Sequence, residues 1–181
     1  MTSHAHAMPP NPAPWAEIVP HVPPMTMDEF LDYPDGDDGH CYELVDGVLV
    51  RMVGSRPRAT RITTRLFRAL DAFVEAHGLG AVTPPDAVYD FERRGQKDTG
   101  LLPDLAVEIA SPRQYRPGMK AKAERYLAGG TALVWVVWPL RQQVDVWHPG
   151  ATQPTILGVG DTLDGESVVP GFRYPVDRLF A

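Results

Sequence analysis

The stretch that decides the fold runs from Thr83 to Pro112 and reads TPPDAVYDFERRGQKDTGLLPDLAVEIASP. Two short segments of strand-favouring residues, 86–91 and 105–109, flank a segment with turn-forming glycines. We predict that the two segments pair as antiparallel strands, with Asp86 opposite Glu108. The midpoint of this hairpin falls at Lys97, within the turn-forming segment.

Alternation along the two predicted strands separates apolar from acidic side chains. The odd-numbered residues of 105–109 are large and apolar, whereas Glu108 lies between two alanines on the other face. Such a face can expose a metal site to a bulky substrate. The same register places Asp90 opposite Asp104, a like-charge pair that is unfavourable unless water or a cation separates the carboxylates. The register therefore stays open.

Composition sets broad limits on the protein. Its 181 residues suffice for one domain with a sizeable core, and 44% hydrophobic with 22% charged residues is typical of globular proteins. Cys41 is the single cysteine, which excludes an intramolecular disulfide and a cysteine-based zinc cluster. No apolar run reaches membrane-spanning length and no secretory signal is visible, so we expect a cytoplasmic protein without membrane contact. The net charge of −6 argues against nucleic acid as a partner, because surfaces that bind phosphates are usually basic. The argument is weak, since the net charge says little about any one surface.

The N-terminal part is expected to contain an arm and a hairpin. Residues 1–24 are rich in proline and lack apolar periodicity, which predicts a flexible arm before a single domain at 25–181. Thr26 and Glu29 have the spacing of a capping box and predict a short helix. The segment 42–53 carries Asp46-Gly47 between strand-favouring residues, which predicts a tight β-hairpin.

A long helix is predicted from about Ala59 to His77. Apolar residues recur there at helical spacing, and Gly78 ends the run. Four arginines follow one another three or four residues apart on another face: Arg58, Arg61, Arg65 and Arg68. This stripe is either a solvated helix face or a ridge that binds the phosphates of a nucleic acid.

The C-terminal half predicts a second helix and several strands. The helix covers 119–127, and the uninterrupted apolar run 131–138 predicts a strand buried on both faces, at the centre of a sheet. Segments 142–147 and 155–159 are predicted as further strands, and 161–165 as a turn. This order of elements indicates a mixed α/β fold with a central mixed β-sheet, two main helices and an N-terminal β-hairpin.

No common catalytic motif occurs in the chain. The sequence lacks a phosphate-binding loop, a dinucleotide fingerprint, a nucleophile elbow and a zinc-protease motif. What remains is a set of carboxylates with a lysine. Asp86 and Glu108 are suited to Mg²⁺, which prefers a few carboxylates plus water, and Lys122 follows on the next predicted helix. Tyr126, one helical turn further, is predicted to belong to the core.

Several motifs in order resemble the Uma2 family. These are YELVDG at 42–47, a Pro-Asp pair, PDLAVEIASP at 103–112, KAERY at 122–126, the strand at 133–137 and VPGF at 169–172. The resemblance extends from about Met27 to Phe180. It implies a restriction-endonuclease-like core with the fold of PD-(D/E)xK nucleases.

The resemblance also implies roles for individual residues. Asp86 and Glu108 would hold Mg²⁺ or Mn²⁺, Lys122 would be the catalytic lysine, and Glu43 would be an additional acid. Because Ala110 stands two residues after Glu108, the lysine cannot come from that strand. Asp104 is the alternative to Asp86, but it lies four residues before Glu108, roughly 13 Å along a strand.

Two functions are therefore weighed. The first is a metal-dependent endonuclease that acts on nucleic acid, with DNA as the expected substrate, bound through the arginine stripe and assembled as a homodimer. The second is a catalytically inactive member of the same fold that serves as a binding or dimerisation module. Convergence of Asp86, Glu108 and Lys122 would favour the first.

Overall fold

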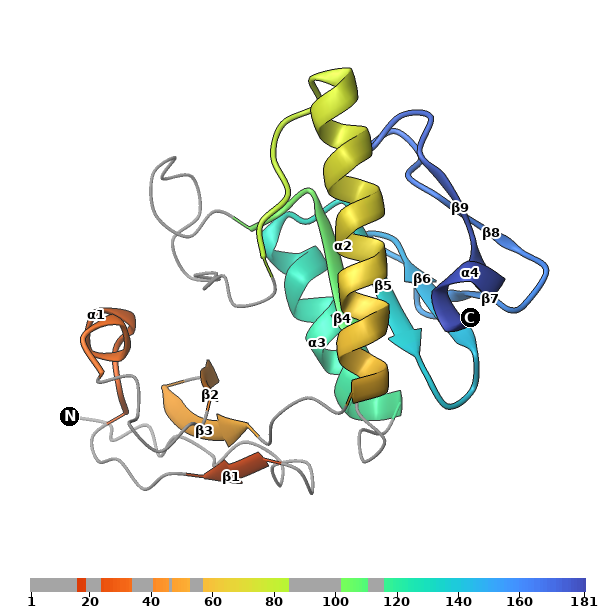
Figure 1. Ribbon diagram of the computed structural model, residues 1–181. Helices are drawn as coiled ribbons and strands as arrows, with labels where there is room; N and C mark the ends of the chain where they lie inside the picture. Colours follow the sequence, from red (N-terminus) through yellow and green to blue (C-terminus); the bar gives the residue numbers. More distant parts are fainter. Residues whose placement is uncertain are drawn as a thin grey trace. The chain divides into compact units, whose positions relative to one another are not determined.

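The computed structural model of the chain describes residues 16–18, 24–33, 41–45, 47–52, 57–84, 102–110 and 116–181 (Figure 1). The chain divides into two compact units, Met1–Gly54 and Ser55–Ala181. The first strand of the predicted central hairpin and its turn lie outside the described residues. Each unit is considered by itself.

The N-terminal unit contains a three-stranded antiparallel sheet and one short helix. Strands β1 (Ala16–Ile18), β2 (Cys41–Val45) and β3 (Val48–Met52) lie in the order β1-β3-β2, and α1 spans Met27–Leu31. The hairpin prediction is confirmed, because Val45 pairs with Val48 across a turn in which Gly47 has φ of +75°. Strand β1 was not expected within the arm, since its three residues are too few to show alternation.

The predicted capping box at α1 is also confirmed. The Glu29 amide donates to Thr26 Oγ1 at 3.2 Å, and the Thr26 amide donates to Glu29 Oε2 at 2.7 Å. Two amides that the first helical turn would leave without partners are thereby satisfied.

The C-terminal unit is built on a mixed sheet. Its strands are β4 (Leu105–Ile109), β5 (Leu133–Trp138), β6 (Gln143–Trp147) and β7 (Thr155–Leu157), in the order β4-β5-β6-β7. Strand β5 is parallel to β4 and antiparallel to β6, and all six of its residues are buried. The apolar run thus forms an inner strand of this sheet, as predicted.

Helices cover the two faces of this sheet. Helix α2 (Pro57–His77) buries Ile62, Leu66 and Leu70 in one core cluster, together with the odd-numbered side chains of β4 and β5. Helix α3 (Arg116–Gly129) connects β4 to β5 and packs against the even-numbered side chains of the same strands. A parallel pair requires such a crossover, and this one places α3 over the face that carries Glu108.

A small two-stranded sheet and a last helix complete the α2 side of the core. Strands β8 (Thr162–Asp164) and β9 (Arg173–Pro175) pair antiparallel, and α4 spans Val176–Phe180. Leu163, Val176 and Leu179 are fully buried in the cluster formed with α2. The prediction of a turn at 161–165 is wrong, because residues 162–164 form strand β8. A strand of three residues shows no periodic pattern in the sequence, and its partner β9 begins nine residues after β8 ends.

No helix in the described ranges is long and apolar enough to cross a membrane.

Candidate functional site

The candidate site is formed around Glu108, near the end of β4. Its side chain points to the α3 face, between Ala106 and Ala110, which are both buried against α3. Its carboxylate retains 17% exposure, so it is neither buried in the core nor fully solvated. The two small neighbours leave room for groups that approach from the helix.

Two side chains of α3 reach the two oxygens of this carboxylate. Lys122 Nζ lies 3.2 Å from Glu108 Oε2, and the Tyr126 hydroxyl donates to Glu108 Oε1 at 2.9 Å. Residues four apart lie on one side of a helix, which is why Lys122 and Tyr126 approach the same acid. A carboxylate held at both oxygens has a fixed orientation.

Glu108, Lys122 and Tyr126 differ in how far their side chains are exposed to solvent. Tyr126 is 8% exposed, with its ring in the core cluster beneath α3, whereas the Lys122 side chain keeps 27% exposure. Tyr126 is therefore a rigid anchor for Glu108. Lys122 is the more exposed of the two side chains that contact Glu108.

The structure brings Glu108 and Lys122 together, as the candidate site requires. Asp86 lies outside the described residues, so its part in the site remains a prediction. Glu43 lies on β2 of the N-terminal unit, and the description of the chain does not extend to its side chain.

Asp104 lies at the start of β4, exposed to solvent. Its carbonyl oxygen accepts hydrogen bonds from the amides of Ala132 and Leu133. From Leu105 to Ile109 the strand pairs with β5 in unbroken register, without a bend that would shorten the path to Glu108. This geometry argues against Asp104 and Glu108 as ligands of one ion, and Asp86 stays a prediction.

Tyr126 is the residue whose role was missed. The prediction that Tyr126 belongs to the core is confirmed by the burial of its side chain. Its hydroxyl also donates a hydrogen bond to Glu108, which was not predicted. The signal was present in the spacing: a lysine and a tyrosine four residues apart, on the helix that follows an acidic strand. A tyrosine buried at such a position needs a partner for its hydroxyl.

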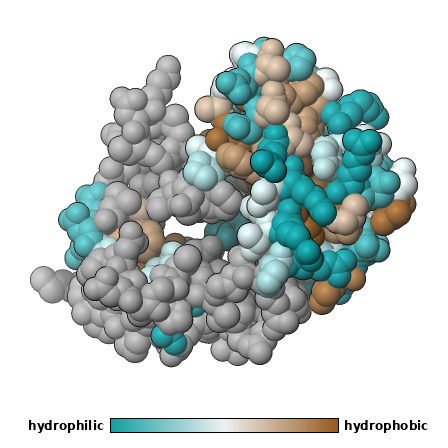
Figure 2. Space-filling model, viewed as in Figure 1, coloured by the Kyte–Doolittle hydropathy of each residue, from teal (hydrophilic) through white to brown (hydrophobic). Residues whose placement is uncertain are grey.

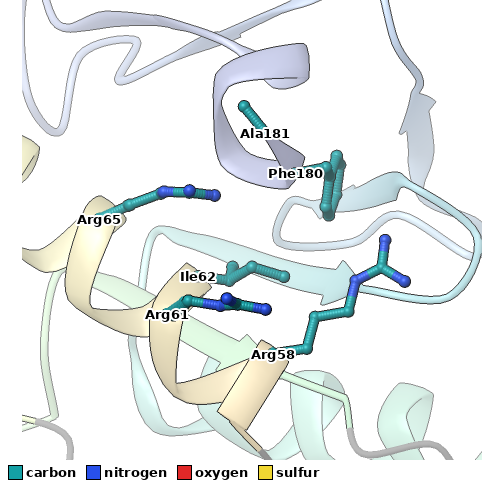
Figure 3. Close-up of a pocket in the computed structure, with 6 residues that line it drawn as sticks. All are labelled: Arg58, Arg61, Ile62, Arg65, Phe180 and Ala181. Atoms are coloured by element: carbon teal, nitrogen blue, oxygen red, sulfur yellow. The ribbon is translucent and has the colours of Figure 1, made fainter.

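The four arginines of α2 lie on the other side of the sheet from the Glu108 side chain, because α2 packs on the opposite face from α3. Arg58, Arg61 and Arg65 surround a cavity of about 370 Å³ together with Phe180 (Figure 3). Arg65 Nη1 also donates to the carbonyl oxygen of Leu179 at 3.1 Å, so this guanidinium holds α4 in place. Hydrophilic side chains cover much of the C-terminal unit on the side shown in Figure 2. Nucleic-acid binding by the stripe stays a prediction.

Of the two acids predicted to hold a metal ion, Glu108 is the one whose side chain the structure describes. Among the residues that the structure describes, no three histidine, cysteine or acidic side chains are grouped closely enough to hold a metal ion. Mg²⁺ commonly keeps several waters and binds through one or two carboxylates. The partly exposed carboxylate of Glu108 would suit that mode of binding, and Asp86 stays the predicted second acid.

Comparisons with known proteins identify the family and the fold. Residues 27–177 match the model of the Uma2 family, described as "Putative restriction endonuclease". A crystal structure from Anabaena variabilis, described as "a putative nuclease belonging to DUF820", superposes with a TM-score of 0.70 at 20% sequence identity. The match covers 87% of this chain and 98% of that one. No curated protein matches the chain.

The structural match supports the fold, and the family model covers most of the sequence. With the acid, lysine and tyrosine of its motifs together on β4 and α3, the chain belongs to the Uma2 family of restriction-endonuclease-like proteins.

Proposed function

We propose that this protein is a metal-dependent endonuclease that hydrolyses phosphodiester bonds in nucleic acid, with DNA as its first substrate. The observation that carries the proposal is the 3.2 Å contact between the Lys122 ammonium and the Glu108 carboxylate, both of which keep partial exposure to solvent. Nuclease family membership and the nuclease-like fold give it support at the level of class.

Glu108 and Asp86 would hold Mg²⁺ or Mn²⁺. When bound there, the ion would supply Lewis-acid stabilisation and an activated water. Glu43 would be a further acid of the site. Tyr126 is a positioning residue, because its hydroxyl fixes one oxygen of Glu108 and leaves the carboxylate a single orientation.

Lys122 would stabilise the negative charge that develops on the phosphodiester. An ammonium has three N–H donors, so one group can contact a carboxylate and a phosphate oxygen at the same time. Donors that are already in place where charge develops lower the barrier more than donors that must reorganise. The ion pair with Glu108 would keep the Lys122 ammonium in such a place.

Arg58, Arg61 and Arg68 would contact phosphates along the backbone. Arg58 and Arg61 border the cavity beside α4, and all three are exposed. Contacts of this kind give affinity without sequence specificity. Arg65 would contribute less, since its guanidinium already binds Leu179. A homodimer would present two such surfaces to one duplex.

One observation favours the second candidate, a catalytically inactive binding module. Both oxygens of the Glu108 carboxylate are already contacted, by Lys122 and by Tyr126. The same fold would then bind nucleic acid or a second copy of the chain without cutting.

Cleavage assays on plasmid and oligonucleotide DNA separate the two candidates. We expect cleavage with Mg²⁺ or Mn²⁺, none with chelator, and a loss of about 100-fold or more in Glu108→Gln. Glu75→Gln, an exposed position on α2, is the matched control and should keep full activity. Equal cleavage by wild type and Glu108→Gln would refute the proposed site. Tight DNA binding without cleavage would establish the module.

A further inference from the structure

A positively charged cavity lies between the first half of α2 and helix α4. Its volume is about 370 Å³, and it is bordered by Arg58, Arg61, Ile62, Arg65, Phe180 and Ala181. Figure 3 shows the three arginine side chains directed into the space between the two helices. Within the part of the chain that the structure describes, no acidic side chain borders this cavity. A cavity whose charged groups share one sign attracts an ion of the opposite sign, here an anion.

The spacing of the arginines explains why they meet at one cavity. Residues three or four positions apart lie on the same side of a helix, so two turns of α2 contribute to one site. Arg65 is partly buried, and its Nη1 donates to the carbonyl oxygen of Leu179 at 3.1 Å. This bond uses one of several N–H donors of the guanidinium and fixes the group at the wall of the cavity. A group that is fixed before a ligand arrives loses less freedom on binding.

The number of cations at the cavity indicates which anion it suits. The N–H donors of a guanidinium match two oxygens of a phosphate or of a carboxylate. A terminal phosphate has three acceptor oxygens and carries about −1.5 to −2 charges near neutral pH. A phosphate within a strand carries a single negative charge, and so does a carboxylate. Three guanidiniums around one cavity therefore favour a terminal phosphate.

An apolar wall adjoins the arginines. The Phe180 ring packs partly against the core and keeps part of its surface exposed at the cavity, beside the buried side chain of Ile62. Aromatic faces stack with nucleobases irrespective of sequence, commonly next to a positively charged groove. A base attached to the phosphate would pack against Phe180.

The cavity and the Glu108 carboxylate belong to opposite faces of the sheet, because α2 and α3 pack on different sides of it. A phosphate held by the arginines is therefore a different phosphate from the one that Lys122 would contact. Binding at the cavity can be measured separately from cleavage.

We propose that this cavity binds the terminal phosphate of a nucleotide, with the three arginines on the phosphate oxygens and Phe180 against the base. The phosphate can belong to a free mononucleotide or to the end of a strand, since both present the same chemistry. The proposal rests on nucleic acid as the ligand in the proposed function. It adds recognition of a terminal nucleotide to the contacts along the backbone.

Calorimetric titration of the full chain, with chelator and without metal, tests the cavity. We expect saturable binding of adenosine 5′-monophosphate. Adenosine, which lacks the phosphate, and inorganic phosphate, which lacks the base, should each bind at least tenfold more weakly. Equal affinities for the monophosphate and adenosine would overturn the proposal, as would the absence of saturable binding.

Variants of the cavity identify the groups that bind. Arg61→Gln should weaken monophosphate binding about tenfold, because charge-assisted hydrogen bonds are lost, and Arg61→Lys should lose less. Arg61 is exposed, so its replacement should leave the melting curve unchanged. Phe180→Leu should weaken binding of the monophosphate but not of inorganic phosphate. Arg178→Gln, exposed on α4 outside the cavity, is the matched control and should bind as wild type. Unchanged affinity in Arg61→Gln would refute the site.

Two oligonucleotides of one sequence, with phosphates at both ends or at neither, identify the source of the phosphate. If a strand end occupies the cavity, the phosphorylated oligonucleotide binds about tenfold tighter to wild type but not to Arg61→Gln. If a free nucleotide occupies it, the two oligonucleotides bind alike and the monophosphate still binds. Cleavage assays on the same preparations keep the two proposals apart. DNA cleavage without monophosphate binding overturns the cavity site alone, and monophosphate binding without cleavage overturns the nuclease alone.

Discussion

At each flank of α3 a basic side chain of the helix contacts an acid of the sheet, but the two acids differ in burial. At one flank the Glu108 side chain keeps 17% exposure, and both of its oxygens are contacted, by Lys122 and Tyr126. At the other flank Asp145 is buried, and its carboxylate is hydrogen-bonded to Arg116 and to the Trp138 indole. An acid at the surface can exchange its partners for a metal or substrate at little cost. A buried acid keeps its partners, because every hydrogen bond lost there is costly.

The largest effect is expected from a substitution that removes the charge of Glu108. In Glu108→Gln we expect cleavage to fall about 100-fold, equivalent to about 2.7 kcal/mol of transition-state stabilisation. Thermal unfolding should change little, since a partly exposed ion pair contributes at most about 1 kcal/mol. Initial cleavage rates beside a melting curve check both parts. A large loss of stability instead would make Glu108 a structural residue.

Removing the partner of the buried acid should act mainly on stability. Arg116→Met leaves Asp145 in the interior with one fewer charged hydrogen bond, and we expect unfolding in urea to be easier by about 2 kcal/mol. Lys120→Met, on the same flank, is the control and should cost less than about 0.5 kcal/mol. If both variants unfold alike, Arg116 and Asp145 do not form a stabilising pair.

Replacing Tyr126 tests whether its hydroxyl positions the Glu108 carboxylate. Tyr126→Phe keeps the ring in the core and removes only the hydroxyl that holds Glu108. We expect about a tenfold loss of cleavage at low metal concentration, partly recovered at high metal concentration, because outer contacts of a ligand tune metal affinity. Titrating cleavage against Mg²⁺ measures this shift. A loss that no metal concentration recovers would contradict it.

The smallest effect expected is a pH dependence from Asp145. Burial raises the pKa of its carboxyl, against the opposing influence of the Trp138 indole and of the guanidiniums of Arg116 and Arg141. The folded state then binds more protons than the unfolded state, so stability falls as the pH rises from the ordinary aspartate pKa through the raised one. Asp145→Asn should lack this fall. Denaturation curves from pH 3.5 to 7 test it, and parallel pH profiles would disprove it.

Prediction from the sequence succeeded where patterns are long. The stripe at Ile62, Leu66 and Leu70 gave α2, and the apolar run gave β5, because both repeat over enough residues to exclude alternatives. Strands β1, β8 and β9 were missed, whereas β7, which also has three residues, was predicted as part of the longer segment 155–159. Their formation depends on a partner strand elsewhere in the chain.

The candidate site was predictable only in part. Acid and lysine could be named from their order along the chain, but the Tyr126 contact depends on how α3 lies across the sheet. The burial of Asp145 gave no sequence signal at all. Alternation in 142–147 predicts a half-buried strand, and an aspartate there would be expected at the solvent side rather than beneath a helix.

The hydrogen bond from Arg65 to Leu179 joins residues 114 positions apart. During synthesis the apolar stripe of α2 therefore leaves the ribosome long before α4, which covers part of it, has been made. Until α4 has been made, the uncovered apolar surface of α2 can associate with other nascent chains. We expect chains stopped before Val176 to aggregate or be degraded, whatever the state of their acidic site.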